Sequence, residues 1–178
     1  LSVVLRPPLK PFLAPQLIFV SAVAVCRSIR DYTGLSATIK WPNDILLNGK
    51  KVCGILTELS AEIDIINYII IGIGINVNQE MDHFPPELQE KAISLAWAGK
   101  TKYNRVGLMQ AVLKELEKEY ELYLTEGFSA VLKHWRSLNS TLGQEVMVSS
   151  TGESFSGIAE DINEEGCLMV RTKEGKLR

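Results

Sequence analysis

The sequence has few of the residues that build disulfide or metal sites. Its 178 residues include three cysteines and two histidines, and Cys26, Cys53 and Cys167 form no Cys-x-x-Cys pair. Separated thiols in an odd number are typical of a reducing compartment, so we expect a cytoplasmic protein. His83 and His134 have no partner at metal-ligand spacing, and the sequence therefore predicts no resident metal.

An excess of positive charge and a long apolar run are also missing. The 19 Lys and Arg residues stand against 21 Asp and Glu, which gives a net charge of −2. No basic field exists to gather nucleic acid, so we expect no nucleic-acid binding through this stretch. The longest apolar run, residues 17–26, is half of the roughly 20 residues that a membrane span needs. We therefore predict no membrane segment.

The two ends of the sequence are abrupt. The chain opens on Leu1, already inside a strand-like apolar run, and it stops at Arg178 without a terminal turn. We expect the sequence to be cut at both ends, with the last strand of the C-terminal unit absent. A strand edge left open in this way has to pair elsewhere, and a homodimer is one way to do so.

The apolar pattern of residues 1–138 predicts an α+β domain. Residues 17–32 are apolar nearly all round, which indicates a buried helix that ends at Gly34. Asn48-Gly49 between two apolar runs predicts a β-hairpin. The isoleucine-rich residues 65–76 are typical of a strand covered on both faces.

Two further helices are expected, over residues 104–124 and over residues 128–138. In the first, apolar residues recur at helical spacing, and lysines and glutamates occupy the outer face. The expected buried stripe consists of Leu108, Met109, Val112, Leu113, Leu116, Tyr120 and Tyr123.

The texture changes after Asn139 to short alternating strands. They are expected over residues 145–148, 155–162 and 168–171, with turns at Thr151-Gly152 and at two later Glu-Gly pairs. This pattern predicts a small β-barrel or sandwich over residues 139–178. Acids outnumber bases here, which makes the unit a poor binder of nucleic acid.

Three polar clusters interrupt the strands of the first domain. They are Lys40-Trp41-Pro42-Asn43-Asp44, Lys50-Lys51 leading to Gly54-Ile55-Leu56-x-Glu58, and Gly72-x-Gly74-Ile75-Asn76-x-Asn78. Taken alone, each cluster has a simple structural explanation, because the first suits a turn with a surface tryptophan and the second suits solvated charge on a hairpin. The glycines of the third suit packing, and the run is not the Gly-x-Gly-x-x-Gly dinucleotide fingerprint.

In this order the three clusters resemble the core of the biotin protein ligase family. The resemblance extends over essentially the whole chain. It implies a mixed β-sheet covered by helices, akin to class II aminoacyl-tRNA synthetases, followed by an SH3-like barrel. It also implies that biotin and ATP form biotinyl-5′-adenylate and that biotin then passes to a lysine of a carboxylase biotin-carrier domain.

The same resemblance assigns roles to individual residues. Lys51 is expected to be catalytic and to face the biotin carboxylate and the α-phosphate, where an ammonium offsets their repulsion. Asp44 is the second catalytic candidate, and three roles stay open for it: binding Mg²⁺, binding the nucleotide, or orienting the acceptor lysine. The resemblance assigns biotin binding to Lys51, Gly54, Ile55, Leu56, Gly72 and Gly74, nucleotide binding to Lys40, Trp41, Asn43, Asp44 and Asn76, and transient Mg²⁺ to the vicinity of Asp44 and Asn76.

The sequence departs from the family pattern at its start. Family members carry a Gly-Arg-Gly-Arg-x-Gly-Arg loop before the strand that matches Ser2 to Arg6, and these residues do not include it. That loop supplies donors and a lid, so we expect little or no ligase activity from residues 1–178 alone. The alternatives are a lipoate-type acyl-adenylate ligase and a non-catalytic module for dimerisation or carrier docking.

Overall fold

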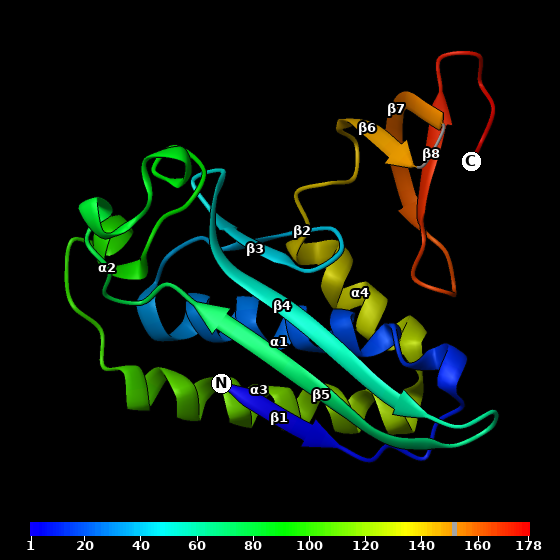
Figure 1. The fold of residues 1–178 in the computed structure, drawn as a ribbon, viewed down its shortest axis with the longest axis horizontal. Coiled ribbons are helices and arrows are strands. Elements are labelled where there is room, and N and C mark those ends of the chain that lie inside the picture. Colours follow the sequence, from blue (N-terminus) through cyan, green and yellow to red (C-terminus); the bar gives the residue numbers. More distant parts are fainter. Residues whose placement is uncertain (151–152) are drawn as a thin grey trace.

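The computed structural model describes residues 1–150 and 153–178, and Figure 1 shows a central sheet with long helices beside it and a separate sheet at the C-terminal end. The predicted turn at Thr151-Gly152 lies outside the described residues. The helices and strands are β1 (Ser2–Leu5), α1 (Gln16–Thr33), β2 (Thr38–Lys40), β3 (Asp44–Leu47), β4 (Lys50–Ala61), β5 (Ile66–Ile75), α2 (Leu95–Gly99), α3 (Arg105–Glu126), α4 (Phe128–Leu138), β6 (Glu145–Ser150), β7 (Glu153–Ile162) and β8 (Leu168–Thr172).

The central sheet has the strand order β1-β5-β4-β3-β2. Each of its four strand pairings is antiparallel, so the α+β class is confirmed and the expectation of a mixed sheet is wrong. The reason is local, because successive strands β2 to β5 are joined by short connections of the hairpin kind rather than by helical crossovers. At the predicted hairpin, Asn48 and Gly49 adopt φ of 51° and 76°, as a turn between β3 and β4 requires.

Helix α1 forms the centre of the core. The helix begins after Pro15. Gly34 ends it, as predicted, in the left-handed conformation at φ 73°. The helix is buried on nearly all sides between the sheet, α3 and α4. By length and composition alone, residues Pro11–Thr33 could cross a membrane. In the fold, however, 72% of the most apolar 18-residue stretch of this segment is buried. Burial in the core accounts for its apolar composition.

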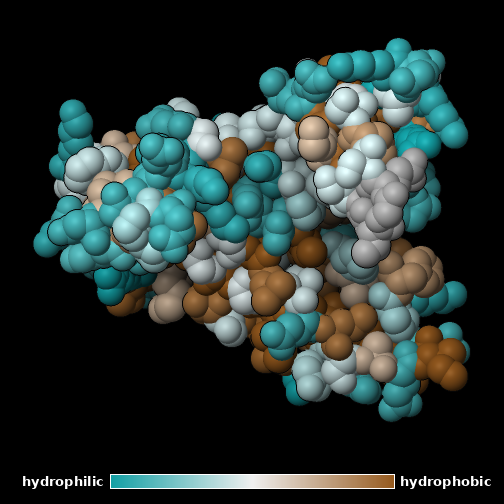
Figure 2. All heavy atoms as spheres, turned by 45° about the horizontal axis from the view of Figure 1, so that its top comes forward, coloured by the Kyte–Doolittle hydropathy of each residue, from teal (hydrophilic) through white to brown (hydrophobic). Residues whose placement is uncertain are grey.

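The helices cover one face of the sheet, and the opposite face is open. Along β5, Ile69, Ile71 and Ile73 are buried whereas Tyr68 and Gly74 are exposed. The expectation that this strand is covered on both faces is therefore wrong. Figure 2 shows apolar atoms gathered across the middle of the molecule, and the exposed large apolar residues of the sheet are Val4, Leu56, Leu59 and Tyr68.

Helix α3 differs from its predicted pattern at one buried carboxylate. Leu108, Val112, Leu116 and Tyr123 are buried as expected, but Met109 and Leu113 are exposed. Glu119, which was expected on the outer face with the other glutamates, is only 2% exposed. It accepts hydrogen bonds from Arg27 of α1 and from His134 of α4, and these two partners explain how a charge can be buried here.

The C-terminal strands form an antiparallel sheet in the order β6-β7-β8. They begin after α4 ends at Leu138, close to the predicted boundary at residue 139. Closure into an SH3-like barrel and likeness to class II synthetases stay predictions. This sheet contacts the first domain through Arg136 of α4, which donates two hydrogen bonds to the Asp161 carboxylate at 2.8 and 3.1 Å.

Candidate functional site

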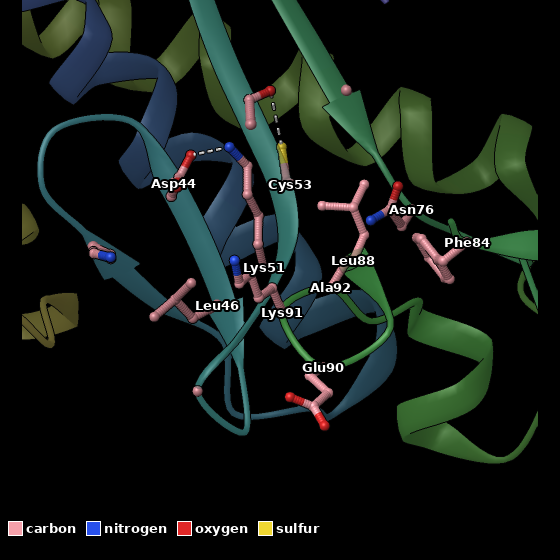
Figure 3. A pocket seen from close by; sticks show the side chains of 14 residues that line it. Asp44, Leu46, Lys51, Cys53, Asn76, Phe84, Leu88, Glu90, Lys91 and Ala92 are labelled. Carbon is pink, nitrogen blue, oxygen red and sulfur yellow. Dashed lines mark hydrogen bonds and ion pairs between the residues drawn. The ribbon is translucent and has the colours of Figure 1, made fainter. Parts of the chain in front are cut away.

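A pocket of about 760 Å³ lies beside the three polar clusters, on the open side of the sheet. Figure 3 shows the side chains that converge on it from β3, β4 and β5 and from the segment after β5. It is lined by Lys40, Asp44, Leu46, Gly49, Lys51, Cys53, Gly54, Gly74, Asn76, Phe84, Leu88, Glu90, Lys91 and Ala92. All three sequence clusters thus contribute to a single pocket.

Lys51 and Asp44 form an ion pair inside this pocket. The Lys51 Nζ lies 2.5 Å from the Asp44 Oδ1, and the two side chains are 48% and 26% exposed (Figure 3). Asp44 stands opposite Gly54 in the antiparallel pairing of β3 with β4, so the lysine side chain extends along its own strand toward Gly54, three residues further on. Partial exposure keeps the Lys51 ammonium accessible to an anionic ligand.

Gly54 makes room for the Lys51 side chain. A Cβ at position 54 would lie 3.0 Å from the Lys51 Cε and 3.1 Å from its Nζ. Glycine at this position therefore lets the lysine cross the strand to Asp44. The Lys51 side chain therefore occupies the space above Gly54.

Gly72 and Gly74 leave open space instead. A Cβ at either position would make only ordinary contacts, at 3.6 Å from the Leu56 carbonyl oxygen and 3.8 Å from the Gly54 carbonyl oxygen. No other part of the described chain needs to approach these two glycines closely. Gly74 lines the pocket, whereas Gly72 and the 63% exposed Leu56 continue the open face beside it.

Asn76 joins the pocket to the segment after β5. Its Nδ2 donates to the Ile93 carbonyl oxygen at 3.2 Å. The same segment pairs with β4, because the Lys51 amide donates to the Lys91 carbonyl oxygen and the Ile93 amide donates to the Lys51 carbonyl oxygen. Both the amide and the carbonyl group of Lys51 are thereby paired with this segment, which fixes the backbone from which the lysine side chain extends.

Trp41, Asn43 and Ile55 do not line this pocket. The Trp41 indole Nε1 donates to the Gly166 carbonyl oxygen at 3.1 Å, and its ring is half-buried. The Asn43 Nδ2 donates to the Ile55 carbonyl oxygen at 2.8 Å. The Ile55 side chain is 1% exposed and faces the helices, so the expectation that it binds a ligand is corrected, because neighbouring residues of a strand point to opposite faces.

Eight lining residues were not among the candidates from the sequence: Leu46, Gly49 and Cys53 in the β3–β4 hairpin, and Ala92 and four others after β5. Phe84, Leu88, Glu90 and Lys91 come from the irregular stretch between β5 and α2, which has only two short 3-10 turns, Met81–His83 and Pro86–Leu88. This polar, proline-containing stretch carries no period that predicts its place. The only available signal was that Phe84 and Leu88 are large apolar residues in an otherwise polar loop.

The pocket does not offer a nucleophilic thiol or a preformed metal cage. Burial raises the pKa of the Cys53 thiol to about 12, so Cys53 stays protonated at neutral pH. Within residues 1–150 and 153–178, no group of three or more His, Cys, Asp and Glu side chains could hold a metal ion. Asp44, already paired with Lys51, is the carboxylate that β3 places in the pocket.

Comparison with known proteins agrees with the motifs. Residues 1–76 match the family model described as "Biotin/lipoate A/B protein ligase family", and residues 141–178 match "Biotin protein ligase C terminal domain". These two matches define the class of protein. They leave residues 77–140, which carry Phe84, Leu88 and Lys91, between them.

Individual relatives narrow the class. The "Bifunctional ligase/repressor BirA" of Bacillus spizizenii is 44% identical over 175 residues, which are 98% of this chain and 54% of that protein. The "Biotin--[acetyl-CoA-carboxylase] ligase" of Paracoccus denitrificans is 29% identical over 98% of this chain and 74% of that protein. A solved biotin protein ligase from Aquifex aeolicus in complex with biotin and ATP has a TM-score of 0.85 and 28% identity, and the match covers 99% of this chain and 73% of that one.

The chain belongs to the biotin protein ligase family. It spans about half the length of the Bacillus relative that it matches.

Proposed function

We propose that this chain carries the site at which an ATP-dependent biotin protein ligase forms biotinyl-5′-AMP and transfers biotin to a lysine of a carboxylase biotin-carrier domain. The observation that carries the proposal is the Lys51 ammonium, held by Asp44 at 2.5 Å in a pocket with Gly74 in its wall. A relative of the same fold was solved with biotin and ATP. The reducing cytoplasm, where ATP is available, is the compartment that we assign to it.

In the first step, a biotin carboxylate oxygen attacks the α-phosphorus of ATP. The new O–P bond forms while the bond from that phosphorus to the pyrophosphate oxygen breaks, and the electron pair leaves with pyrophosphate. Both reactants are anions, so the half-exposed Lys51 ammonium lowers their repulsion and stabilises the charge that develops at phosphorus. Mg²⁺ enters with ATP as part of the substrate, and Asp44 is the pocket carboxylate that suits it.

Biotin and ATP can bind to different parts of the pocket. The open strand face at Gly74, continued by Gly72 and Leu56, suits the biotin ring and chain, since glycine has no side chain to keep a ligand away from the strand. Phe84 and Leu88 form an apolar wall that suits a flat adenine base, with Asn76 beside them. Lys40 and Lys91 place two further ammonium groups where ATP phosphates can lie.

In the second step, the ε-amine of the carrier lysine attacks the acyl carbon of the adenylate. The amide C–N bond forms, the acyl C–O bond breaks with its electron pair leaving on the AMP phosphate, and the amine proton passes to solvent. Asp44 is the group placed to hold that amine, because AMP formation leaves Lys51 free to follow the departing phosphate. Of the three roles open for Asp44, we therefore favour orientation of the acceptor lysine, which follows its pairing with Lys51 in the first step.

The test is biotin transfer by a chimera in which residues 1–178 replace the matching segment of the Bacillus spizizenii relative. We expect the chimera to biotinylate a carrier domain and Lys51→Ala to lower the rate about 10²- to 10³-fold. Lys133→Ala, which alters an exposed lysine of α4, is the matched control. Equal rates for Lys51→Ala and Lys133→Ala would reject Lys51 as the catalytic lysine.

Lipoate and the unextended chain complete the experiment. Lipoate in place of biotin tests the lipoate-type alternative, and we expect no adenylate from it. Residues 1–178 by themselves should form adenylate far more slowly than the chimera does, if the Gly-Arg loop of the family supplies the expected donors. Adenylate formed from lipoate faster than from biotin would overturn the substrate assignment.

A further inference from the structure

The turn between β2 and β3 is held from the C-terminal unit at two points. The Trp41 backbone amide donates to the Thr141 Oγ1 at 2.9 Å, and the Trp41 indole Nε1 donates to the Gly166 carbonyl oxygen at 3.1 Å. Thr141 and Gly166 lie 100 and 125 positions along the chain from Trp41. Such long-range bonds do not form in an isolated β2–β3 hairpin.

The first of these points is buried and reinforced. Thr141 is 7% exposed, so its hydroxyl has little access to water. Beside it, the Ser140 amide donates to the Ile39 carbonyl oxygen at 2.8 Å, and residue 39 forms a parallel bridge with Asn139. The segment 139–141 therefore runs alongside the end of β2 and continues its pairing.

The second point is the loop between β7 and β8, residues 163–167. Asn163 organises it, because its side-chain oxygen accepts from the amides of Glu165 and Cys167 at 3.1 and 2.8 Å. The loop packs on α1, where the Gln16 Nε2 donates to the Glu164 carbonyl oxygen at 2.9 Å. The Gly166 carbonyl is thereby presented to the indole from a fixed position.

The same turn leads directly into the pocket. Two residues after Trp41, the Asn43 carbonyl oxygen accepts from the Ile55 amide of β4 at 3.0 Å. The Asn43 Nδ2 donates to the Ile55 carbonyl oxygen at 2.8 Å. The next residue is Asp44, which holds Lys51. A shift of the turn would therefore move the carboxylate that sets the place of the lysine ammonium.

We propose that the C-terminal sheet acts as a positioning element for the pocket, with Thr141 and the Gly166 carbonyl fixing Trp41 and, through Asn43, the Asp44–Lys51 pair. Trp41 is a positioning residue and not a ligand-binding one, because its donors are used within the chain. The inference deepens the proposed function, because it concerns the geometry of the same site. It also gives the C-terminal unit a part in catalysis without any contact to substrate.

A simpler account is that the C-terminal sheet merely stabilises the fold. The chain offers a matched control for this account, because Arg136 and Asp161 tie the same sheet to α4 without touching Trp41. Arg136→Gln removes this tie without changing a residue that bonds Trp41. Thr141→Val removes only the hydroxyl, and Thr141→Ser restores an acceptor for the Trp41 amide.

The decisive experiment is hydrogen exchange by NMR on residues 1–178, which needs no ligand. The Ile55 amide reports the turn, because it donates to the Asn43 carbonyl oxygen, and the amides of β5 serve as the internal reference. For loss of one hydrogen bond, we expect Thr141→Val to raise the Ile55 rate relative to β5 by about three- to tenfold. Thr141→Ser should restore the ratio, and Arg136→Gln should leave it unchanged. A ratio unaffected by Thr141→Val, or shifted equally by Arg136→Gln, would overturn the proposal.

A titration with a non-hydrolysable biotinyl-adenylate mimic connects the turn to the site. We expect Thr141→Val and Trp41→Phe to weaken binding about three- to tenfold, and Thr141→Ser to bind like the parent. Weakening that matches the Arg136→Gln value would contradict a positioning role. If no variant binds the mimic, the proposed function fails, while the exchange ratio still decides the positioning of the turn.

Discussion

The side chain of Lys51 crosses Gly54 to reach Asp44, so that one glycine and one carboxylate together place the ammonium in the pocket. Neither partner alone fixes it, because a lysine side chain has many rotamers and an exposed ion pair contributes little by itself. The missing Cβ at position 54 supplies the path, and Asp44 supplies the end point.

Gly54→Ala should therefore displace Lys51 without unfolding the sheet. The added Cβ would lie 3.0 Å from the Lys51 Cε, and the half-exposed lysine can move away at little cost in stability. We expect binding of a biotinyl-adenylate mimic, measured by calorimetry, to weaken about tenfold or more, with a melting temperature close to that of the parent. Unchanged affinity would show that the path of Lys51 across Gly54 does not matter.

The buried Glu119 should be one of the most sensitive positions in the helical layer. Glu119→Ala removes the carboxylate that Arg27 and His134 share, and Arg27 keeps Glu115 at 3.6 Å, so we expect a loss of about 1–3 kcal/mol in the free energy of unfolding. Glu117→Ala, two residues along on the exposed face, should change it by less than about 0.5 kcal/mol. Urea denaturation followed by circular dichroism measures both. Similar values for the two variants would mean that the buried ion network is not stabilising.

Docking of the C-terminal sheet should weaken in acid. The hydrogen bonds from Arg136 hold the pKa of Asp161 below its usual value of 3.8. A lowered pKa in the folded state adds stability above the unfolded value, and this contribution is lost as the pH falls from about 4 through the folded pKa. Because both side chains are well exposed, the effect should be about 0.5 kcal/mol. Urea denaturation of the parent and of Asp161→Asn between roughly pH 3 and pH 6 measures this contribution. If the free energy of unfolding of the two proteins changed with pH in parallel, the contribution would be absent.

The three thiols should differ sharply in reactivity. Burial raises the pKa of Cys53 to about 12 and that of Cys26 to about 11, whereas Cys167 is exposed. Iodoacetamide followed by mass spectrometry should label Cys167 first and the other two only on unfolding. Stability from the raised pKa values is present below the unfolded value of 9.0 and is lost as the pH rises toward 11. Rapid labelling of Cys53 at neutral pH would mean that the strand around it opens.

Much of the fold could be predicted because its signals are local. Gly34 ends α1 and Asn48-Gly49 forms the hairpin, since the backbone conformation at those positions depends on the residue itself. Coverage of β5 could not be predicted, because a run of isoleucines looks the same whether one face or both are packed. The burial of Glu119 depends on Arg27 and His134, which come from other helices.

The candidate site divides in the same way. Lys51, Asp44, Gly54, Gly74 and Asn76 were named because their motifs, in this order, resemble the family core, and the pairing of β3, β4 and β5 brings them to one pocket. Phe84 and Lys91 were missed, since a loop without a period gives no indication of where it folds back. Trp41 was assigned to the nucleotide through the family resemblance of its motif, whereas its partners, Thr141 and Gly166, lie far along the sequence.

The most direct test of the site is calorimetric titration of residues 1–178 and of Lys51→Ala with a non-hydrolysable biotinyl-adenylate mimic. We expect the parent to bind the mimic in preference to adenosine monophosphate, and Lys51→Ala to weaken that binding by about 1.5–3 kcal/mol, because a charge-assisted contact to the phosphate is lost. Equal affinity of the parent and Lys51→Ala for the mimic would contradict the assignment of this pocket as the adenylate site.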